Sequence, residues 1–212
     1  MVRVTDVVPT PHPSVAQLTP AVRDRRSTTI FDGSYELGRD DLESLLRAAQ
    51  WAPSGGNTQP WAWFVLDRGS EGHGALLEVL SDGNVPWVPA ASVVLVAAAQ
   101  IATDPDGNGR DRPMTAAFDT GLSMAGLLAE ATARGLATHP LGGYNAGELA
   151  LALGLPDWFQ IMCAVAVGKP GNVSEASEAL VEKENRERTR KPLVQFVFGS
   201  SFGEPYDPSF TD

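Results

Sequence analysis

The chain has 212 residues, of which 43% are hydrophobic and 20% are charged, so a well-filled core is expected and wholesale disorder is not. Acidic residues outnumber basic residues by 26 to 16, and the net charge of -10 argues against a binder of nucleic acids or anionic membranes. The single cysteine, Cys163, excludes an internal disulfide and a multi-cysteine zinc site.

The N-terminal part is expected to be extended first and then helical. Residues 1–13 carry three prolines and predict an extended arm, whereas residues 14–212 predict one domain without a linker. Ser14 is a candidate cap for a short helix that runs toward Arg25. Residues 40–49 place leucines on one face and acids at the N-terminal end, which predicts a helix that Pro53 stops.

Three continuous apolar runs predict strands that are buried on both faces, at residues 61–66, 92–97 and 161–167. A short strand is expected at 137–141, and short helices are expected at 74–81 and 148–153. Since helices and strands alternate irregularly, the sequence predicts one α+β layer structure.

The central part of the chain holds a polar excursion followed by the strongest helical signal. Residues 103–113 are rich in turn formers and predict a mobile excursion, a candidate lid. Residues 115–134 are apolar almost all round, so the sequence predicts a helix that is buried on most of its sides.

Two basic patches lie near opposite ends of the chain. They hold seven of the 16 basic residues: Arg23, Arg25 and Arg26, then Arg186, Arg188, Arg190 and Lys191. Either patch can be a solvated face that neutralises neighbouring acids such as Glu182, Glu184 and Glu187. Alternatively, both patches converge on one phosphate, because the planar guanidinium matches phosphate oxygens and Ser27 adds a hydroxyl donor.

Two glycine-containing segments are candidates for a small-molecule site. Residues 52–61 (APSGGNTQPW) combine Ser54, Asn57 and Gln59, whose side chains donate and accept hydrogen bonds and so suit a heteroaromatic ligand. A plain connecting turn explains the glycines but not this set of polar groups. In residues 140–143 (PLGG), two glycines after a strand expose backbone N–H groups, although a simple turn into the next helix has the same pattern.

Together these segments resemble the nitroreductase family of flavoproteins. The string at residues 52–61 is the most specific, and further matching strings follow in the family's order from about residue 22 to residue 203: Arg25-Arg26-Ser27, residues 119–121 (DTG), 140–143, 153–156 (LGLP), 168–170 (GKP) and 190–193 (RKPL). The resemblance implies an α+β fold with a mixed, mostly antiparallel sheet flanked by helices, in an intertwined homodimer.

The resemblance also implies that FMN binds between the two copies. Its phosphate and ribityl chain would be held by Arg25, Arg26, Ser27, Arg188 and Arg190 of one chain, and the partner chain would contribute Pro53, Ser54, Asn57 and Gln59. The ring would be lined by Pro140, Leu141, Gly142 and Gly143, with the Gly142 N–H near flavin N5. NADH or NADPH would pass a hydride to N5 and leave, and a small-molecule electron acceptor would replace it, so no catalytic side chain is expected.

One position departs from the family pattern. Thr29 stands where the family often has arginine or lysine near the pyrimidine edge of the flavin. We expect the uncharged threonine to give a lower flavin midpoint potential, unless Arg110 or Arg112 supplies the missing charge.

The acceptor and the exact reaction remain open at this stage. A reductase of nitroaromatics or quinones is the main hypothesis; the alternatives are a biosynthetic or catabolic flavoenzyme of the same fold (a dehydrogenase, a dehalogenase or a flavin-degrading enzyme) and a non-catalytic flavin-binding module. The three scattered histidines predict no metal site, and Cys163 is interpreted as a core residue. Trp87 is interpreted as a core or interface residue, with stacking on a flavin or substrate as the alternative. Because no secretory signal or membrane-length apolar stretch is visible, a cytoplasmic protein is expected.

Overall fold

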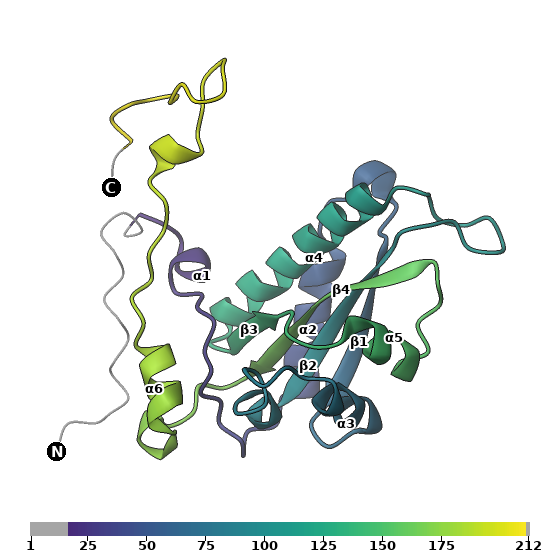
Figure 1. Ribbon diagram of the computed structural model, residues 1–212, viewed down its shortest axis with the longest axis vertical. Helices are drawn as coiled ribbons and strands as arrows, with labels where there is room; N and C mark the ends of the chain where they lie inside the picture. Colours follow the sequence, from purple (N-terminus) through teal and green to yellow (C-terminus); the bar gives the residue numbers. More distant parts are fainter. Residues whose placement is uncertain (1–16, 211–212) are drawn as a thin grey trace.

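A computed structural model describes residues 17–210 and shows a four-stranded sheet with helices on both faces (Figure 1). The strands are β1 (Trp61–Asp67), β2 (Val93–Gln100), β3 (Ala137–Leu141) and β4 (Phe159–Gly168), in the spatial order β1-β2-β4-β3. Every neighbouring pair is antiparallel. The α+β prediction is therefore confirmed, whereas the expected arm at residues 1–13 and the Ser14 cap lie outside the described residues.

The helices connect the strands and cover the sheet. They are α1 (Pro20–Arg23), α2 (Arg39–Gln50), α3 (Glu71–Glu78), α4 (Pro113–Ala133), α5 (Ala146–Ala152) and α6 (Glu178–Glu184). Short 3-10 turns occur at Gly55–Asn57 (η3), Val88–Ala90 (η4), Val173–Glu175 (η5) and Leu193–Gln195 (η6). In the described part of the chain, no helix combines the length and the apolarity that crossing a membrane requires.

The central strand β2 is buried on both faces and separates two hydrophobic clusters. One cluster contains Leu76 of α3, Leu149 of α5 and Trp87, and the other contains Leu45 of α2 and Leu127 of α4. All five of these side chains are fully or almost fully buried. Since burial of each large apolar side chain stabilises by about 1.5–3 kcal/mol, this three-layer packing fixes the sheet that carries the site.

Three local expectations from the sequence were wrong in detail. The strand that begins at Trp61 was expected to be buried on both faces, but β1 is an edge strand and is mostly half-buried. Helix α3 begins at Glu71 rather than residue 74, because the Ser70 Oγ accepts a hydrogen bond from the His73 N–H and caps the helix. Asn145 caps α5 in the same way, so that helix begins before residue 148.

Helix α4 has an unusual distribution of polarity. Its buried face includes Asp119, Thr120 and Ser123, while Met114 and Phe118 are 87% and 67% exposed. The helix packs closely on α2, since a Cβ added at Gly126 would lie 2.7 Å from the Ala48 carbonyl oxygen. The exposed apolar residues would be covered in the homodimer that the family resemblance implies.

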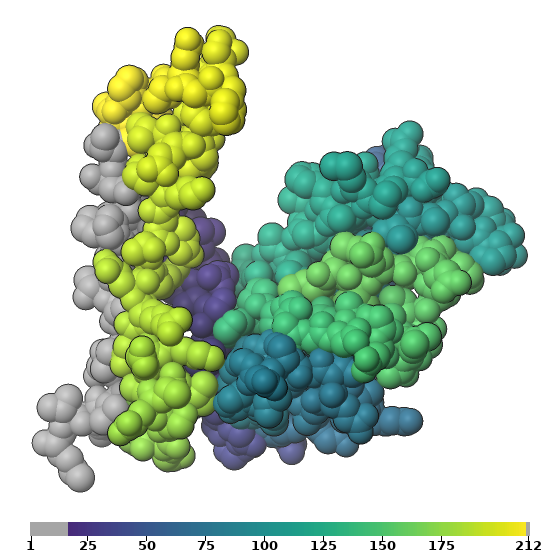
Figure 2. All heavy atoms as spheres, viewed as in Figure 1, coloured from purple at the N-terminus to yellow at the C-terminus, as the bar shows by residue number. Residues whose placement is uncertain are grey.

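The C-terminal segment leaves the body of the molecule after α6 (Figures 1 and 2). Figure 2 shows residues coloured yellow extending away from the sheet and its helices. This segment exposes aromatic side chains, among them Phe196 at 56%, Phe202 at 94% and Tyr206 at 69%. Such a segment gains little from packing within one chain, which leaves its apolar surface available to a second copy.

Candidate functional site

A wide groove lies where the N-terminal segment 24–34 meets β3 and α6. Ser27 forms a parallel bridge with Thr138 at the start of β3, and Phe31 pairs with Pro170 after β4. Residues 24–34, 132–138 and 170–185 all contribute to the lining of this groove, whose volume is about 1430 Å³. The space is large enough for a ligand of mononucleotide size.

Three arginines from the two basic patches approach one another beside this groove. Burial lowers the pKa of Arg25, and the positive charges of Arg188 and Arg190 lower it further. Burial together with the charges of Arg190 and Arg26 also lowers the pKa of Arg188. The two patches also touch, because the Arg188 Nη1 donates to the Arg23 carbonyl oxygen at 3.2 Å.

The same three arginines have no acidic partner within residues 17–210. No ion pair joins Arg25, Arg188 or Arg190 to a carboxylate there. Their guanidinium groups bond instead to neutral oxygens: Arg25 to the Ser27 Oγ at 3.3 Å, Arg188 to the Arg23 carbonyl at 3.2 Å and Arg190 to the Thr189 carbonyl at 2.7 Å. The Asp24 carboxylate is near enough to raise the pKa of Arg188, but it pairs with Arg23 and forms no ion pair with the three arginines. A cluster of positive charges whose guanidinium groups bind no carboxylate is a good receptor for an anion.

Arg26 is used differently from its neighbour Arg25. Its Nη2 lies 2.9 Å from Glu184 Oε1 in an ion pair whose carboxylate is only 10% exposed. The interpretation of the patches as charges that neutralise nearby acids therefore describes Arg26, while the phosphate interpretation fits Arg25. The expected role of Arg26 as a direct phosphate ligand is weakened, because its guanidinium already binds a carboxylate.

Thr29 belongs to the same network as Arg26. It is buried, its backbone N–H donates to Glu184 Oε2 at 2.8 Å, and its Oγ1 lies 3.4 Å from the same oxygen. Arg110 and Arg112, the expected sources of a compensating charge, lie elsewhere in the chain, beside the loop that follows α2. The prediction about the midpoint potential remains a prediction.

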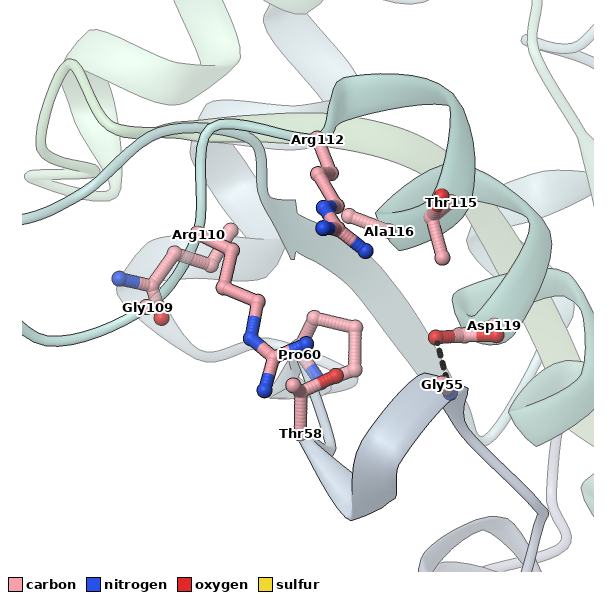
Figure 3. A pocket seen from close by; sticks show the side chains of 10 residues that line it. Gly55, Thr58, Pro60, Gly109, Arg110, Arg112, Thr115, Ala116 and Asp119 are labelled. Atoms are coloured by element: carbon pink, nitrogen blue, oxygen red, sulfur yellow. Dashed lines mark hydrogen bonds between the residues drawn. The ribbon is translucent and has the colours of Figure 1, made fainter.

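The loop from Pro53 to Gln59 forms a tightly built turn at the start of β1 (Figure 3). The Asp119 carboxylate of α4 accepts a hydrogen bond from the Gly55 N–H at 3.0 Å, and the Ser54 Oγ accepts one from the Gln59 N–H at 3.0 Å. Asn57 and Gln59 both have positive φ, 55° and 46°. Such backbone strain in non-glycine residues is concentrated at functional sites, and here it presents exposed polar side chains.

A small cavity of about 50 Å³ separates this loop from residues 109–119. Figure 3 shows Arg110 and Arg112 extending from one side of it toward Thr58 and Thr115. The Arg110 guanidinium lies 3.4 Å from the place of a Cβ at Gly56. Within the excursion, the Asp104 carboxylate accepts from the Asn108 N–H at 2.7 Å, so residues 104–108 form a hydrogen-bonded turn, and the role of residues 103–113 as a mobile lid remains a prediction.

The end of β3 carries the remaining candidate segment, residues 140–143. Leu141 is buried, Pro140 is half-buried and Gly142 is exposed. The Gly143 carbonyl accepts hydrogen bonds from the Ser81 N–H, the Ser81 Oγ and the Asn84 Nδ2, each at 2.9 Å. Those three bonds fix the turn, and within residues 17–210 the Gly142 N–H has no hydrogen-bond acceptor, so it is free to bind a ligand.

One chain does not bring the Pro53–Gln59 loop to the arginine cluster. The loop is tied to Asp119 near the start of α4, whereas the groove beside Arg25 includes Thr132 near the end of that helix. Asp119 and Thr132 are thirteen positions apart in α4, which corresponds to about 20 Å along the helix axis. The figure agrees, since α1 lies at the opposite end of α4 from the loop (Figure 1).

Two residues that organise the site were not predicted as site residues. Glu184 binds the 26–29 segment, whereas the sequence indicated it only as one of several acids that a basic patch could neutralise. Asp119 anchors Gly55, and its only signal was its place in the 119–121 string. The core interpretation of Trp87 is correct, since it is 1% exposed and stacks on His139 with ring centroids 4.2 Å apart.

The chain is similar to known proteins in sequence and in fold. A sequence model of the nitroreductase family matches residues 22–83 and 70–169. An uncharacterized 15.4 kDa protein in the ask 5' region of Mycolicibacterium smegmatis is 33% identical over 139 residues, which are 66% of this chain and 90% of that protein. A protein of Archaeoglobus fulgidus, named provisionally as an NADH dehydrogenase/NAD(P)H nitroreductase, is 29% identical over 73% of this chain and 86% of its own length.

Solved structures show the same fold. A crystal structure described as that of an oxidoreductase containing FMN superposes with a TM-score of 0.80 at 31% identity and covers 88% of this chain and 93% of its own chain.

Proposed function

Because this chain belongs to the nitroreductase family, we propose that two copies of it bind FMN between them and reduce a small electrophilic acceptor, such as a nitroaromatic or a quinone, with NADH or NADPH. The coarser assignment, an oxidoreductase, is supported by the family and by relatives named as NAD(P)H oxidoreductases.

The observation that carries the proposal is the cluster formed by Arg25, Arg188 and Arg190. These guanidinium groups repel one another and lack a carboxylate partner among the described residues. A phosphate monoester carries close to two negative charges at neutral pH, so it would relieve this repulsion and accept several charge-assisted hydrogen bonds. The donor set therefore fits the phosphate of FMN, and Ser27 adds a neutral donor beside Arg25.

The polar loop at Pro53–Gln59 supports a shared site rather than a site within one chain. Its amides and hydroxyl suit the edge of a heteroaromatic ring. However, the loop contacts the N-terminal part of α4, whereas the arginines of the same chain lie near the C-terminal end of that helix. We therefore assign it to the flavin of the second copy. The exposed apolar residues of α4 and the exposed aromatics of the C-terminal segment supply the surface that such a homodimer would bury.

Bound FMN would supply the redox chemistry, by accepting a hydride from the nicotinamide and delivering it to the acceptor. The chain's own contribution is binding and orientation. The arginines would hold the phosphate, the strained loop of the second copy would form hydrogen bonds with the ring edge, and the exposed Gly142 N–H at the end of β3 would donate a hydrogen bond. No side chain is assigned as a nucleophile or a general base.

The purified protein tests the proposal directly. We expect a yellow protein that releases FMN as its chromophore on denaturation. In the absence of oxygen, NADH or NADPH should bleach the flavin absorbance band at about 450 nm. Bleaching followed by recovery on addition of a quinone or a nitroaromatic supports the reductase. Bound flavin that neither nicotinamide bleaches would leave only a binding module, and a colourless protein that takes up no FMN would contradict the proposal.

A further inference from the structure

Glu184 is the most heavily bonded carboxylate beside the arginine cluster, although it lies on a mostly exposed helix. Its Oε1 accepts from the Thr28 Oγ1 at 2.8 Å and pairs with Arg26 Nη2 at 2.9 Å, and its Oε2 accepts from the Thr29 N–H at 2.8 Å. The carboxylate is 10% exposed, so these donors replace most of its water. One side chain thus joins α6 to the 26–29 segment.

The 26–29 segment is also fixed from its other side. The His139 Nδ1 lies 2.7 Å from the Thr28 carbonyl oxygen, and the His139 ring stacks on the fully buried Trp87. Thr28 is therefore held between β3 and α6. Because His139 belongs to β3 of the core sheet, the contacts of Glu184 with Thr28 and of Thr28 with His139 connect α6 to that sheet.

The position of α6 determines where Arg188 and Arg190 lie. Only four and six residues separate them from Glu184, and after Asn185 the chain is extended, without further regular structure until Leu193. On the other side of the contact, Glu184 holds Arg26, and the Arg188 Nη1 donates to the Arg23 carbonyl oxygen at 3.2 Å. The adjacent Arg25 is close enough to Arg188 and Arg190 for their charges to lower its pKa. The same carboxylate thus sets both halves of the arginine cluster.

We propose that Glu184 is a positioning residue that assembles the phosphate-binding arginines and does not itself touch the ligand. The inference rests on the proposed function, since it assigns the cluster to the phosphate of a flavin mononucleotide. It also separates the two neighbouring arginines: Arg25 binds the phosphate, and Arg26 is part of the contact that positions it.

The sign of the effect in Glu184→Gln distinguishes positioning from simple charge. Removal of a negative charge near an anion site makes the field more positive, so charge alone predicts tighter FMN binding in the variant. Positioning predicts the opposite. The amide keeps one acceptor oxygen but turns an NH₂ group toward donors, so the contacts to Thr28, Thr29 and Arg26 cannot all remain.

The experiment is a titration of FMN and of riboflavin, which lacks the phosphate, into apoprotein of the wild type, Glu184→Gln and the control Glu182→Gln. Glu182 is exposed on the same helix, and its replacement by glutamine changes the net charge by the same amount. We expect Glu184→Gln to weaken FMN about tenfold, the lower end of what a lost charged hydrogen bond costs, and to leave riboflavin affinity within about twofold. Glu182→Gln should leave both affinities unchanged, and Glu184→Asp, which keeps the charge, should recover part of the loss.

Several results would overturn the proposal. Unchanged or tighter FMN binding by Glu184→Gln would show that the carboxylate acts only through its charge or not at all. An equal loss of FMN and riboflavin, or a variant that does not fold, would show that the residue supports the whole fold rather than the arginines. A wild-type protein that binds no FMN would refute the proposed function instead, and that outcome is read from the wild-type titration alone.

Discussion

Replacement of Arg25 by glutamine should have opposite effects on the apoprotein and on the flavin complex. Arg25 is half-buried, is repelled by Arg188 and Arg190, and makes only a 3.3 Å contact to the Ser27 Oγ. Since burial and like charges both disfavour this guanidinium, its removal should leave the apoprotein as stable as before or slightly more stable. A charged hydrogen bond to phosphate is worth about 1.5–3 kcal/mol, so FMN affinity should fall roughly 10- to 150-fold.

A titration and an unfolding experiment measure these two effects. Quenching of flavin fluorescence gives the FMN dissociation constant at several salt concentrations, and thermal unfolding of apoprotein gives its stability. The loss of affinity should shrink at high salt, because ions screen the contact of phosphate with an exposed cluster. Arg39→Gln is a matched control, because Arg39 is exposed at the start of α2 and far from the cluster in sequence. A destabilised apoprotein with unchanged FMN affinity would refute the reasoning.

Three further changes test the packing and a buried charge state. Phe118→Asp, on the exposed apolar face of α4, should shift the protein to monomers in light scattering and lower its flavin content; a dimer of normal flavin content would contradict the assignment of that face. Gly126→Ala should lower the free energy of unfolding in urea by about 1–3 kcal/mol, because its Cβ would meet the Ala48 carbonyl oxygen. The control Gly74→Ala, in open space, should be neutral or stabilising by up to about 1 kcal/mol, and equal effects of the two changes would argue against the close contact of α2 with α4. Burial lowers the pKa of His73, so the folded protein binds fewer protons than the unfolded chain, and its stability should decrease as the pH falls below about 6.5. His73→Gln should reduce this decrease, and a variant whose stability has the same pH profile as the wild type would contradict the assignment of the decrease to His73.

Local sequence signals predicted the elements whose ends they encode. The strand expected at residues 137–141 is β3, and the helix expected at 115–134 is α4 within two residues at each end. Both are bounded by strong signals, since Pro113 opens the helix and Gly135 follows it with a positive φ of 65°. Helix α3 was misplaced by three residues because its capping serine, Ser70, was overlooked.

Features that depend on distant partners could not be predicted in the same way. A continuous apolar run at residues 61–66 shows that both faces are apolar, but only the pairing order makes β1 an edge strand. The sequence offered two roles for the basic patches, and Arg25 and Arg26 divide between them because Glu184 pairs with Arg26 across 158 residues of chain. No local pattern indicates which of two adjacent arginines faces a carboxylate.

Mixed dimers test the central claim, that each flavin site takes its arginines from one copy and its polar loop from the other. One chain carries Arg25→Ala with Arg190→Ala, the second carries Asn57→Ala with Gln59→Ala, and both are co-expressed with different tags and purified as heterodimers. A shared site predicts that one of the two sites carries all four changes and the other none, so the heterodimer should hold about one FMN while each parent homodimer holds little. If the heterodimer bound no more flavin than its parents, the arginines and the loop would serve the same chain and the account would be wrong.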